Sequence, residues 1–317
     1  MKSVRIVIVN YKTPALVVDC LRSLVEEVKV VGDCKVVVVE NGSPDESATI
    51  IGKAITENGW QSWAEQLAIP KNLGFAGGNN VALQPLLAAD PKPDYVLLLN
   101  PDTVVRPGAV KVLLDFLEAH PQIGIAGSRL EDPDGTPQRS AFRFHTIRSE
   151  LENGLKLGFV SRLFAGSLVA PPVRDDEHAI DWVAGASMLV RREVFDAIGL
   201  LDDGYFLYYE EVDFMLRAAR AGWPTWYVPT SRVVHLVGQA SGVTDTKKPA
   251  RRLPPYWFAA RKRYFTKNHG WFYAKAADVC WLGGFMLWRL RRRVQGKPDT
   301  DPPHYIGDFV RYTWLTT

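Results

Sequence analysis

The chain has few cysteines and no long apolar run, although its 317 residues leave room for both. Three scattered cysteines are too few for a disulfide framework or a paired-cysteine metal site, and they favour a reducing cytoplasm. The apolar run at 4–9 is too short for a signal peptide, so we expect none. With 47% hydrophobic and 23% charged residues, the composition excludes intrinsic disorder, collagen-like repeats and a polytopic membrane protein.

Charge is distributed unevenly along the sequence. Residues 240–297 contain fourteen Lys and Arg against two Asp, a local net charge of +12, whereas the first 239 residues carry −7. A mildly acidic body with a strongly basic C-terminal part favours an anionic partner for that part.

Short runs of β-branched and other apolar residues at 4–9, 36–39 and 95–99 are typical of buried parallel strands, and a weaker strand is expected at 66–70. The helices expected between them start after Thr13, start after Ser43, and span 77–89 and 107–120. Pro14 suits the first position of a helix capped by Thr13, and Ser43 with Glu46 has the spacing of a capping box. This alternation predicts an α/β fold with a largely parallel sheet. We expect this part of the chain to form a nucleotide-binding half.

The alternation ends near Gly127, where we expect an appended substrate-binding half that reaches about residue 240. Its sequence begins with turn signals at 133–135 and a segment of uncertain structure at 146–175. Periodic hydrophobic residues return at 181–190. Helices are expected at 192–198 and 211–221, and strands at 226–228 and 233–237.

Polar residues follow each expected strand, where ligands bind in open α/β sheets. They are Asn10 and Tyr11, Glu40 and Asn41, Asn72 to Gly78, and Asn100 and Asp102. Four such sets at one edge of the sheet predict a ligand site. The glycines at 74, 77 and 78 permit either a simple turn or a phosphate contact at a helix N-terminus.

Carboxylates in two places suit catalytic or metal chemistry. Asp102 follows a strand, where it either holds a divalent cation or caps a turn. Glu210, Glu211 and Asp213 stand at a helix start, a position that acids favour for the helix dipole alone. The apolar segment 204–207, which precedes this helix, would nevertheless shield a carboxyl there from water and raise its pKa, as a general base requires. His235 lies in an apolar run and is either a core histidine or a metal ligand.

Taken together, these residues resemble a family 2 glycosyltransferase of the GT-A fold, in the rhamnosyltransferase-like branch. The matching segments are IVIVNYKT (6–13), VVVVENGSPD (36–45), NLGFAGGNN (72–80), LLLNPDT (97–103), WVAGASMLVRREVFDAIG (182–199), LDDGYFLYYEEVDFMLR (201–217) and VVHLVG (233–238). They occur in the family's order and cover residues 4 to about 270.

The resemblance implies an inverting, metal-dependent transfer of a sugar from a nucleotide diphosphate to a hydroxyl, with Mg²⁺ or Mn²⁺ as cofactor. The residues it assigns to the nucleotide-sugar are Val9, Asn10, Tyr11, Glu40, Gly74, Phe75, Asn79, Asn100 and Asp102. Relatives carry Asp where this chain has Glu40, and their DxD motif is reduced here to Asn100-Pro101-Asp102, with His235 as the second metal ligand.

The resemblance also places the general base in a Glu-Asp pair that reads Glu210-Glu211 here. By position Glu211 is the base, although either glutamate suits the role. Trp182, Gly185 and Ala186 would line the acceptor side, and the alternative for Trp182 is a core aromatic.

The C-terminal extension, residues 241–317, has arginine clusters around an aromatic stretch at 271–288. That stretch is too short and too charged to span a bilayer, and it suits a helix lying on an anionic membrane at the inner face. The alternative is a helix packed on the catalytic domain or on a second subunit of a homo-oligomer. No motif supports a nucleic-acid partner.

We therefore expect dTDP-L-rhamnose as donor, with UDP-hexoses as the alternative, and a glycan or lipid-linked glycan as acceptor, in cell-wall or polysaccharide biosynthesis. A sugar-phosphate nucleotidyltransferase would need a glycine-rich basic loop after the first strand, where this chain reads Asn10-Tyr11-Lys12-Thr13. A non-catalytic glycan- or lipid-binding module would have lost the carboxylates that are present here.

Overall fold

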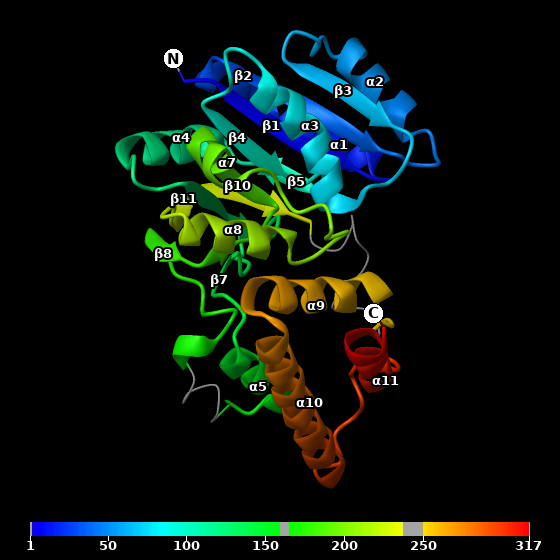
Figure 1. Ribbon diagram of the computed structural model, residues 1–317. Helices are drawn as coiled ribbons and strands as arrows, with labels where there is room; N and C mark the ends of the chain where they lie inside the picture. Colours follow the sequence, from blue (N-terminus) through cyan, green and yellow to red (C-terminus); the bar gives the residue numbers. More distant parts are fainter. Residues whose placement is uncertain (1, 159–164, 237–249, 317) are drawn as a thin grey trace.

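The computed structural model describes residues 2–158, 165–236 and 250–316 (Figure 1). Its centre is a mixed sheet with the strand order β3-β2-β1-β4-β10-β6-β11-β5, and β8 pairs with β11 beside this path. The four strands of the N-terminal half are parallel to one another, and they are β1 (Val4–Asn10), β2 (Cys34–Asn41), β3 (Ala64–Ile69) and β4 (Tyr95–Leu99).

Alternate residues of these strands face two different helical layers. Ile6 and Ile8 of β1 pack with the layer formed by α1 (Pro14–Val31), α2 (Ser47–Glu57) and α4 (Ala109–Ala119). Val7 faces the opposite layer, formed by α3 (Gly74–Ala88), α7 (Arg192–Ile198) and α8 (Glu210–Arg220). A strand covered on both sides must be apolar throughout, which explains the continuous hydrophobic runs in the sequence.

The second half of the chain extends the same sheet. Strand β10 (Ser187–Arg191) is inserted antiparallel between β4 and β6 (Ile125–Glu131). Strand β11 (Thr225–His235) pairs with β6, with β5 (Thr103–Val105) and with β8 (His178–Ile180). A short separate ribbon joins β7 (Ala141–Phe142) to β9 (Trp182–Val183). Strands from both sides of residue 127 therefore build one sheet.

The sequence predicts the central strands and the existence of most helices, but several boundaries differ. Helix α3 begins at Gly74 instead of Gly77, and the two strands expected at 226–228 and 233–237 form the single strand β11, with a bulge between Val228 and Arg232. Residue 237 and residues 159–164 of the uncertain segment lie outside the described residues, and that segment contains α5 (Ile147–Leu155) and a 3-10 turn (Ala165–Ser167).

Both predicted helix caps are wrong. Helix α1 begins at Pro14 as expected, but the Thr13 hydroxyl donates to Asn10 Oδ1 at 3.0 Å instead of capping the helix. Helix α2 begins at Ser47, and the Ser43 hydroxyl accepts the Lys12 N–H at 2.9 Å. The Thr13 hydroxyl is thus bound by the last residue of β1, and the Ser43 hydroxyl by the loop after β1, so neither forms the cap that the sequence predicts.

The C-terminal extension consists of α9 (Pro255–His269), α10 (Trp271–Val294), α11 (Tyr305–Val310) and a π-helical turn (Arg311–Leu315). Figure 1 shows α9 crossing beneath α8, and α10 running away from the sheet beside α5. In the part of the chain that the structure describes, no helix combines the length and apolar character needed to span a membrane.

Helices α5 and α10 approach each other closely through glycines. A Cβ atom on Gly154 of α5 would lie 2.5 Å from the backbone oxygen of Trp281, and one on Gly284 would lie 3.0 Å from the backbone oxygen of Leu151. Gly283, the next residue, faces the other way, with nothing within 4 Å of its Cβ position.

This contrast predicts opposite effects of the same substitution. Gly154→Ala should lower the free energy of unfolding by about 1–3 kcal/mol, because the helices must separate to admit a methyl group. Gly283→Ala should raise it by up to ~1 kcal/mol, because alanine is the better helix former in open space. Denaturant titration of both variants measures the difference, and equal destabilisation by the two would contradict the packing described.

Candidate active site

The carboxyl ends of β1 and β2 form the first wall of the site. Asn10 and Glu40 lie opposite each other in the strand register, both buried, with Asn10 Nδ2 3.5 Å from Glu40 Oε1. Glu40 also accepts the Ser43 N–H at 3.0 Å, and Asn10 Oδ1 accepts the Thr13 N–H. Two loops are thereby fixed to the strand ends, with the Tyr11 ring at their exposed edge.

Asn41 organises the adjoining loop, a role that sequence reasoning missed. Its amide donates to Asn72 Oδ1 at 3.1 Å and to the Gly74 carbonyl at 2.9 Å, and its oxygen accepts the Leu73 N–H. Three polar groups of this turn, in Asn72, Leu73 and Gly74, are thus bound by one buried side chain at the end of β2. The clue in the sequence was its place directly after a strand.

Helix α3 is joined at its start to the loop before α8. Gly74 has a φ of +74°, and a Cβ there would lie 1.9 Å from the backbone oxygen of Phe206, so only glycine fits. The Phe75 N–H donates to that same oxygen at 2.8 Å. Asn79, one turn further, donates its amide to the Phe75 carbonyl, so its buried side chain supports the helix start.

The loop after β4 carries the second group of predicted ligands. Asp102 is buried, and its Oδ1 has no hydrogen-bond partner, but it lies 3.4 Å from His235 Nε2. Pairing of β5 with β11 sets Thr103 opposite His235, and this places Asp102 close to His235 although the two are far apart in the sequence. An unsatisfied carboxylate oxygen beside an imidazole nitrogen is a pair of ligand atoms that suits a divalent cation.

These two side chains are a partial ligand set. Among the described residues no group of three or more His, Cys, Asp or Glu is placed to hold a metal ion. A cation bound by Asp102 and His235 would complete its coordination with oxygens from a ligand or water, as is usual for cations that hold phosphate groups.

Gly185 and Ala186 connect this loop to the other walls. The Ala186 carbonyl accepts the Asn100 N–H at 3.0 Å, which fixes the loop to the start of β10. A Cβ on Gly185 would lie 3.4 Å from the Phe75 ring and 3.7 Å from Glu211 Cβ. The residues predicted for donor, acceptor and base therefore meet at one place, around a glycine that leaves room between them.

Glu210 and Glu211 begin α8 immediately after two residues in a strained backbone conformation. Tyr208 and Tyr209 have φ values of +74° and +68°, which non-glycine residues rarely adopt outside functional sites. One carboxylate oxygen of each glutamate is buried without a hydrogen-bond partner. Burial raises the pKa of Glu211 to about 7, and burial together with the nearby Glu211 charge raises the pKa of Glu210 well above its usual range.

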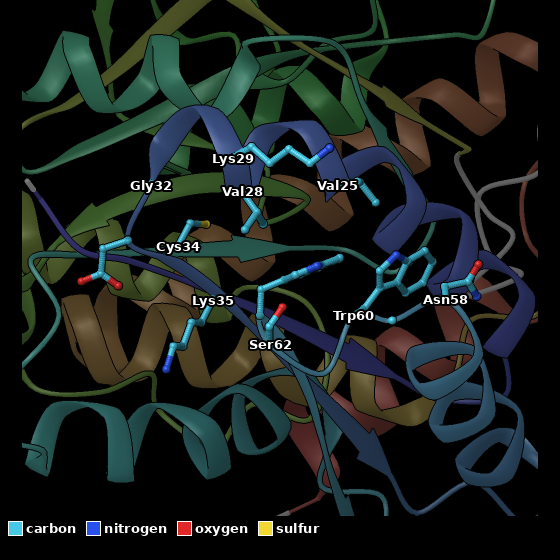
Figure 2. Close-up of a pocket in the computed structure, with 12 residues that line it drawn as sticks. Val25, Val28, Lys29, Gly32, Cys34, Lys35, Asn58, Trp60 and Ser62 are labelled. Carbon is cyan, nitrogen blue, oxygen red and sulfur yellow. The ribbon is translucent and has the colours of Figure 1, made fainter.

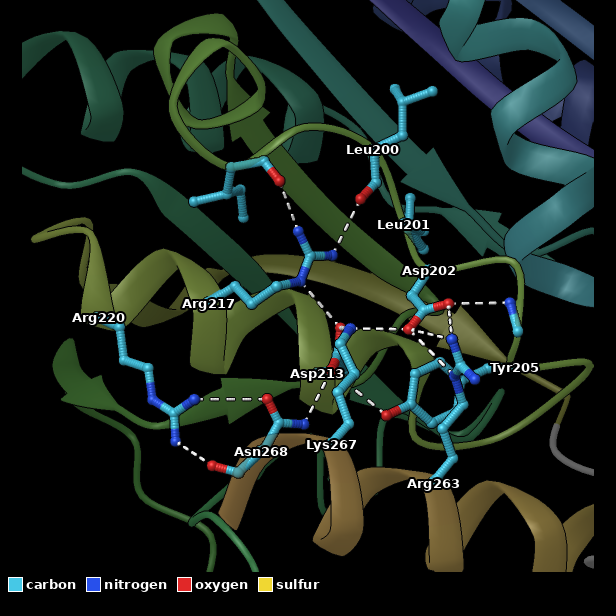
Figure 3. Close-up of polar contacts among 12 residues, drawn as sticks. Leu200, Leu201, Asp202, Tyr205, Asp213, Arg217, Arg220, Arg263, Lys267 and Asn268 are labelled. Atoms are coloured by element: carbon cyan, nitrogen blue, oxygen red, sulfur yellow. Dashed lines mark hydrogen bonds and ion pairs between the residues drawn. The ribbon is translucent and has the colours of Figure 1, made fainter. Parts of the chain in front are cut away.

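The third acid of this helix has a different environment. Asp213 is fully buried and accepts hydrogen bonds from Arg217 at 2.9 Å, Lys267 at 2.8 Å and Asn268 at 2.8 Å, as Figure 3 shows. Its charge is thus compensated, and it fastens α8 to α9. Of the three acids, Glu210 and Glu211 have the unsatisfied oxygens expected of reactive groups.

Trp182 is packed as a core aromatic, the alternative that its sequence left open. Its ring stacks on Phe142 with 4.2 Å between centroids, and its indole N–H donates to the Arg143 carbonyl. A contact between Trp182 and an acceptor stays a prediction. Sequence reasoning missed Tyr256 of α9, whose ring lies 5.3 Å from that of Phe206 beside the loop before α8.

A separate hollow lies at the opposite end of the strands (Figure 2). Cys34 at the start of β2 lines it, together with Lys29, Trp60 and Trp63 from α1 and from the segment between α2 and β3. Glu40 stands six positions after Cys34 in β2, which corresponds to about 20 Å along an extended strand. This hollow is therefore distinct from the site at the carboxyl ends.

Comparison with known proteins agrees with this fold. The sheet matches that of the mannosyltransferase PcManGT from Pyrobaculum calidifontis, solved with GDP-Man and Mn²⁺, with a TM-score of 0.57 and 13% identity over 100% of this chain and 89% of that one. That similarity defines a GT-A fold. The sequence model described as glycosyltransferase-like family 2 matches residues 2–265, so the chain belongs to this family.

Two of the curated relatives are rhamnosyltransferases. The chain is 30% identical over 182 residues to an N-acetylglucosaminyl-diphospho-decaprenol L-rhamnosyltransferase of Mycobacterium tuberculosis, covering 57% of this chain and 58% of that protein. It is 28% identical to the rhamnosyltransferase WbbL of Escherichia coli, covering 51% of this chain and 60% of that protein. The match thus spans about three-fifths of each relative's length.

The raised pKa of Glu211 predicts a pH-dependent cost to stability. Between about pH 4.5 and 7 the folded protein keeps a proton that the unfolded chain has lost, so rising pH destabilises the fold over this range. Glu211→Gln removes this effect and should be more stable than wild type at pH 8, on the order of 1–3 kcal/mol, with little difference at pH 4.5.

Thermal unfolding at the two pH values, with the exposed Glu57→Gln as control, measures this difference. A Glu211→Gln protein that is less stable than wild type at pH 8 would contradict the assignment.

Proposed function

We propose that this chain transfers a sugar from a nucleotide diphosphate donor to a hydroxyl of a glycan or lipid-linked glycan, with inversion at the anomeric carbon. The observation that carries the proposal is the pair of unsatisfied carboxylates, Glu210 and Glu211. Gly185 lies between Glu211 and Phe75, and the carbonyl of its neighbour Ala186 accepts an N–H from the loop that carries Asp102. A base, a donor wall and a carboxylate that can hold a diphosphate-bound cation are the parts that such a transfer requires.

The base is Glu211. With a pKa of about 7 it is about half ionised at neutral pH and basic enough to accept a proton, the balance that favours general-base catalysis. It would take the proton of the acceptor hydroxyl while that oxygen attacks the anomeric carbon, from the face opposite the leaving diphosphate. Glu210, the residue before it, is also buried, and burial together with the Glu211 charge raises its pKa well above the usual range.

Asp102 and His235 would hold a divalent cation, Mg²⁺ or Mn²⁺, together with the diphosphate. Such an ion offsets the negative charge that develops on the departing nucleotide diphosphate. Burial of Asp102 Oδ1 strengthens its attraction for a cation, because little water screens it.

The donor that we favour is dTDP-L-rhamnose, and the support is the similarity to the rhamnosyltransferases of M. tuberculosis and E. coli. A UDP-hexose is the alternative. Asn10, Tyr11 and Glu40 would contact the base and ribose, and Gly74, Phe75 and Asn79 would line the remainder of the donor site. The mycobacterial relative's name includes a diphospho-decaprenol, which supports a lipid-linked acceptor and hence work at a membrane surface.

Removing the base should abolish most turnover without removing donor binding. Glu211→Gln should lower kcat about 10²–10⁴-fold, because general-base assistance has that magnitude. Wild-type kcat should rise with pH through about 7, and the variant's residual rate should lose this dependence. Nucleotide release from dTDP-rhamnose with a lipid extract as acceptor source measures both, and near-normal turnover by Glu211→Gln would refute the role.

Metal dependence is tested at Asp102. Asp102→Ala and EDTA should each suppress nucleotide release, whereas Asp134→Ala, an exposed carboxylate in a turn, should leave it unchanged. Release that survives both treatments would refute the metal site. If wild type instead bound glycan but no nucleotide-sugar of a dTDP, UDP and GDP panel, the chain would be a binding module.

A further inference from the structure

One face of α10 is apolar and exposed along the whole helix. We call this the α10 stripe, and its members, each between 57% and 84% exposed, are Phe272, Val279, Met286, Leu287, Leu290 and Val294. At 100° per residue they fall within a sector of about 100°, and Gly283 lies in the same sector with open space at its Cβ position.

The opposite face of α10 is already occupied. Ala277, Trp281, Gly284 and Phe285 are buried, and the helix packs on α5 and α9 there. The helix is therefore apolar on both sides, although the described residues cover only one of them. An exposed apolar band of this length marks an interaction surface instead of ordinary solvent-facing protein.

The charges around the stripe are positive. Arg293 and Lys297 are exposed at its C-terminal end, and Arg289 and Arg291 flank it. The one acidic residue of α10, Asp278, is buried on the other side and paired with Arg261. A partner that covers the stripe therefore meets cations and no carboxylate from this helix.

Indole rings lie at the N-terminal end of the helix. Trp271 is 58% exposed, and Trp314 of the following π-helical turn is 46% exposed, with Lys275 Nζ 4.3 Å from its ring centroid. Tryptophan beside a cation favours the boundary between water and hydrocarbon, where its ring is buried and its N–H stays hydrated.

We propose that the α10 stripe inserts into the surface of an anionic lipid bilayer, with the helix lying parallel to the membrane. Apolar side chains over about 33 Å, with a cationic rim, match an acyl boundary beneath negative headgroups. A second copy of the chain, placed stripe against stripe, fits less well because its own stripe brings the same cations. The proposal deepens the proposed function by placing the site at a membrane-borne acceptor, but lipid binding itself does not depend on catalysis.

The test is sedimentation of the full chain with vesicles, without donor or acceptor. Wild type should bind vesicles of phosphatidylcholine with about 30% phosphatidylglycerol, should bind phosphatidylcholine alone far more weakly, and should be released as salt screens the charges. Met286→Gln/Leu290→Gln should reduce the partition coefficient about tenfold or more, because it removes two inserting side chains. Arg293→Gln/Lys297→Gln should reduce binding several-fold on anionic vesicles alone.

A matched control distinguishes the stripe from exposed apolar residues in general. Val30→Gln/Ile50→Gln removes two side chains that are 56% and 42% exposed on α1 and α2, and it should bind vesicles like wild type. Circular dichroism should show unchanged folding for every variant, since all these side chains lie at the surface.

Two results would overturn the proposal. Wild type that stays in the supernatant at millimolar anionic lipid excludes membrane docking. A lipid-free dimer that Met286→Gln/Leu290→Gln converts to monomer assigns the stripe to a second copy. Because no turnover is measured, neither result bears on the transferase assignment, and a failed transferase assay would leave the vesicle result standing.

Discussion

The buried carboxylate of Asp213 is the constraint on which the site depends. It lies one turn beyond the strained tyrosines, and its bonds to Arg217 and Lys267 hold the start of α8 against α9. Lys267 and Arg263 also bind Asp202, at the other end of the loop that leads into α8 (Figure 3). Two anchored ends leave the intervening loop few conformations, and the left-handed residues persist because the surroundings impose them. Loss of both cations would leave the Asp213 charge buried and uncompensated.

The same helix start carries compensated and uncompensated charge side by side. Asp213 contributes to stability, whereas Glu210 and Glu211 are buried without a cation and oppose folding as they ionise. Folded proteins retain such groups where chemistry needs a carboxyl with a raised pKa. The Asp102 Oδ1 atom in the loop after β4 is likewise buried without a hydrogen-bond partner, 3.4 Å from His235 Nε2.

How much the sequence predicts depends on whether local residues decide the outcome. Strands β1, β2 and β4 follow from continuous apolar runs, because burial on both faces requires them. The predicted cap at Thr13 fails because its hydroxyl donates to Asn10, three residues earlier. The one at Ser43 fails because its hydroxyl accepts the N–H of Lys12, 31 residues earlier. The pairing of Asp102 with His235 rests on a β5–β11 contact that no local pattern encodes, and the family resemblance alone indicated it. The partners of Asp213 on α9 were out of reach for the same reason.

Helix α9 connects the site to the surface that α10 presents. Its Lys267 and Asn268 hold α8, and Arg261, between one and two turns earlier, binds Glu150 of α5 and Asp278 of α10 in a buried ion network. Buried pairs contribute little net stability but enforce a single arrangement where each charge is satisfied, as here. Since α5, α8 and α10 are all fixed to one helix, an α10 stripe lying on a bilayer would set the height and tilt of Glu211 above it. An acceptor held in that bilayer would then meet the base at a constant distance.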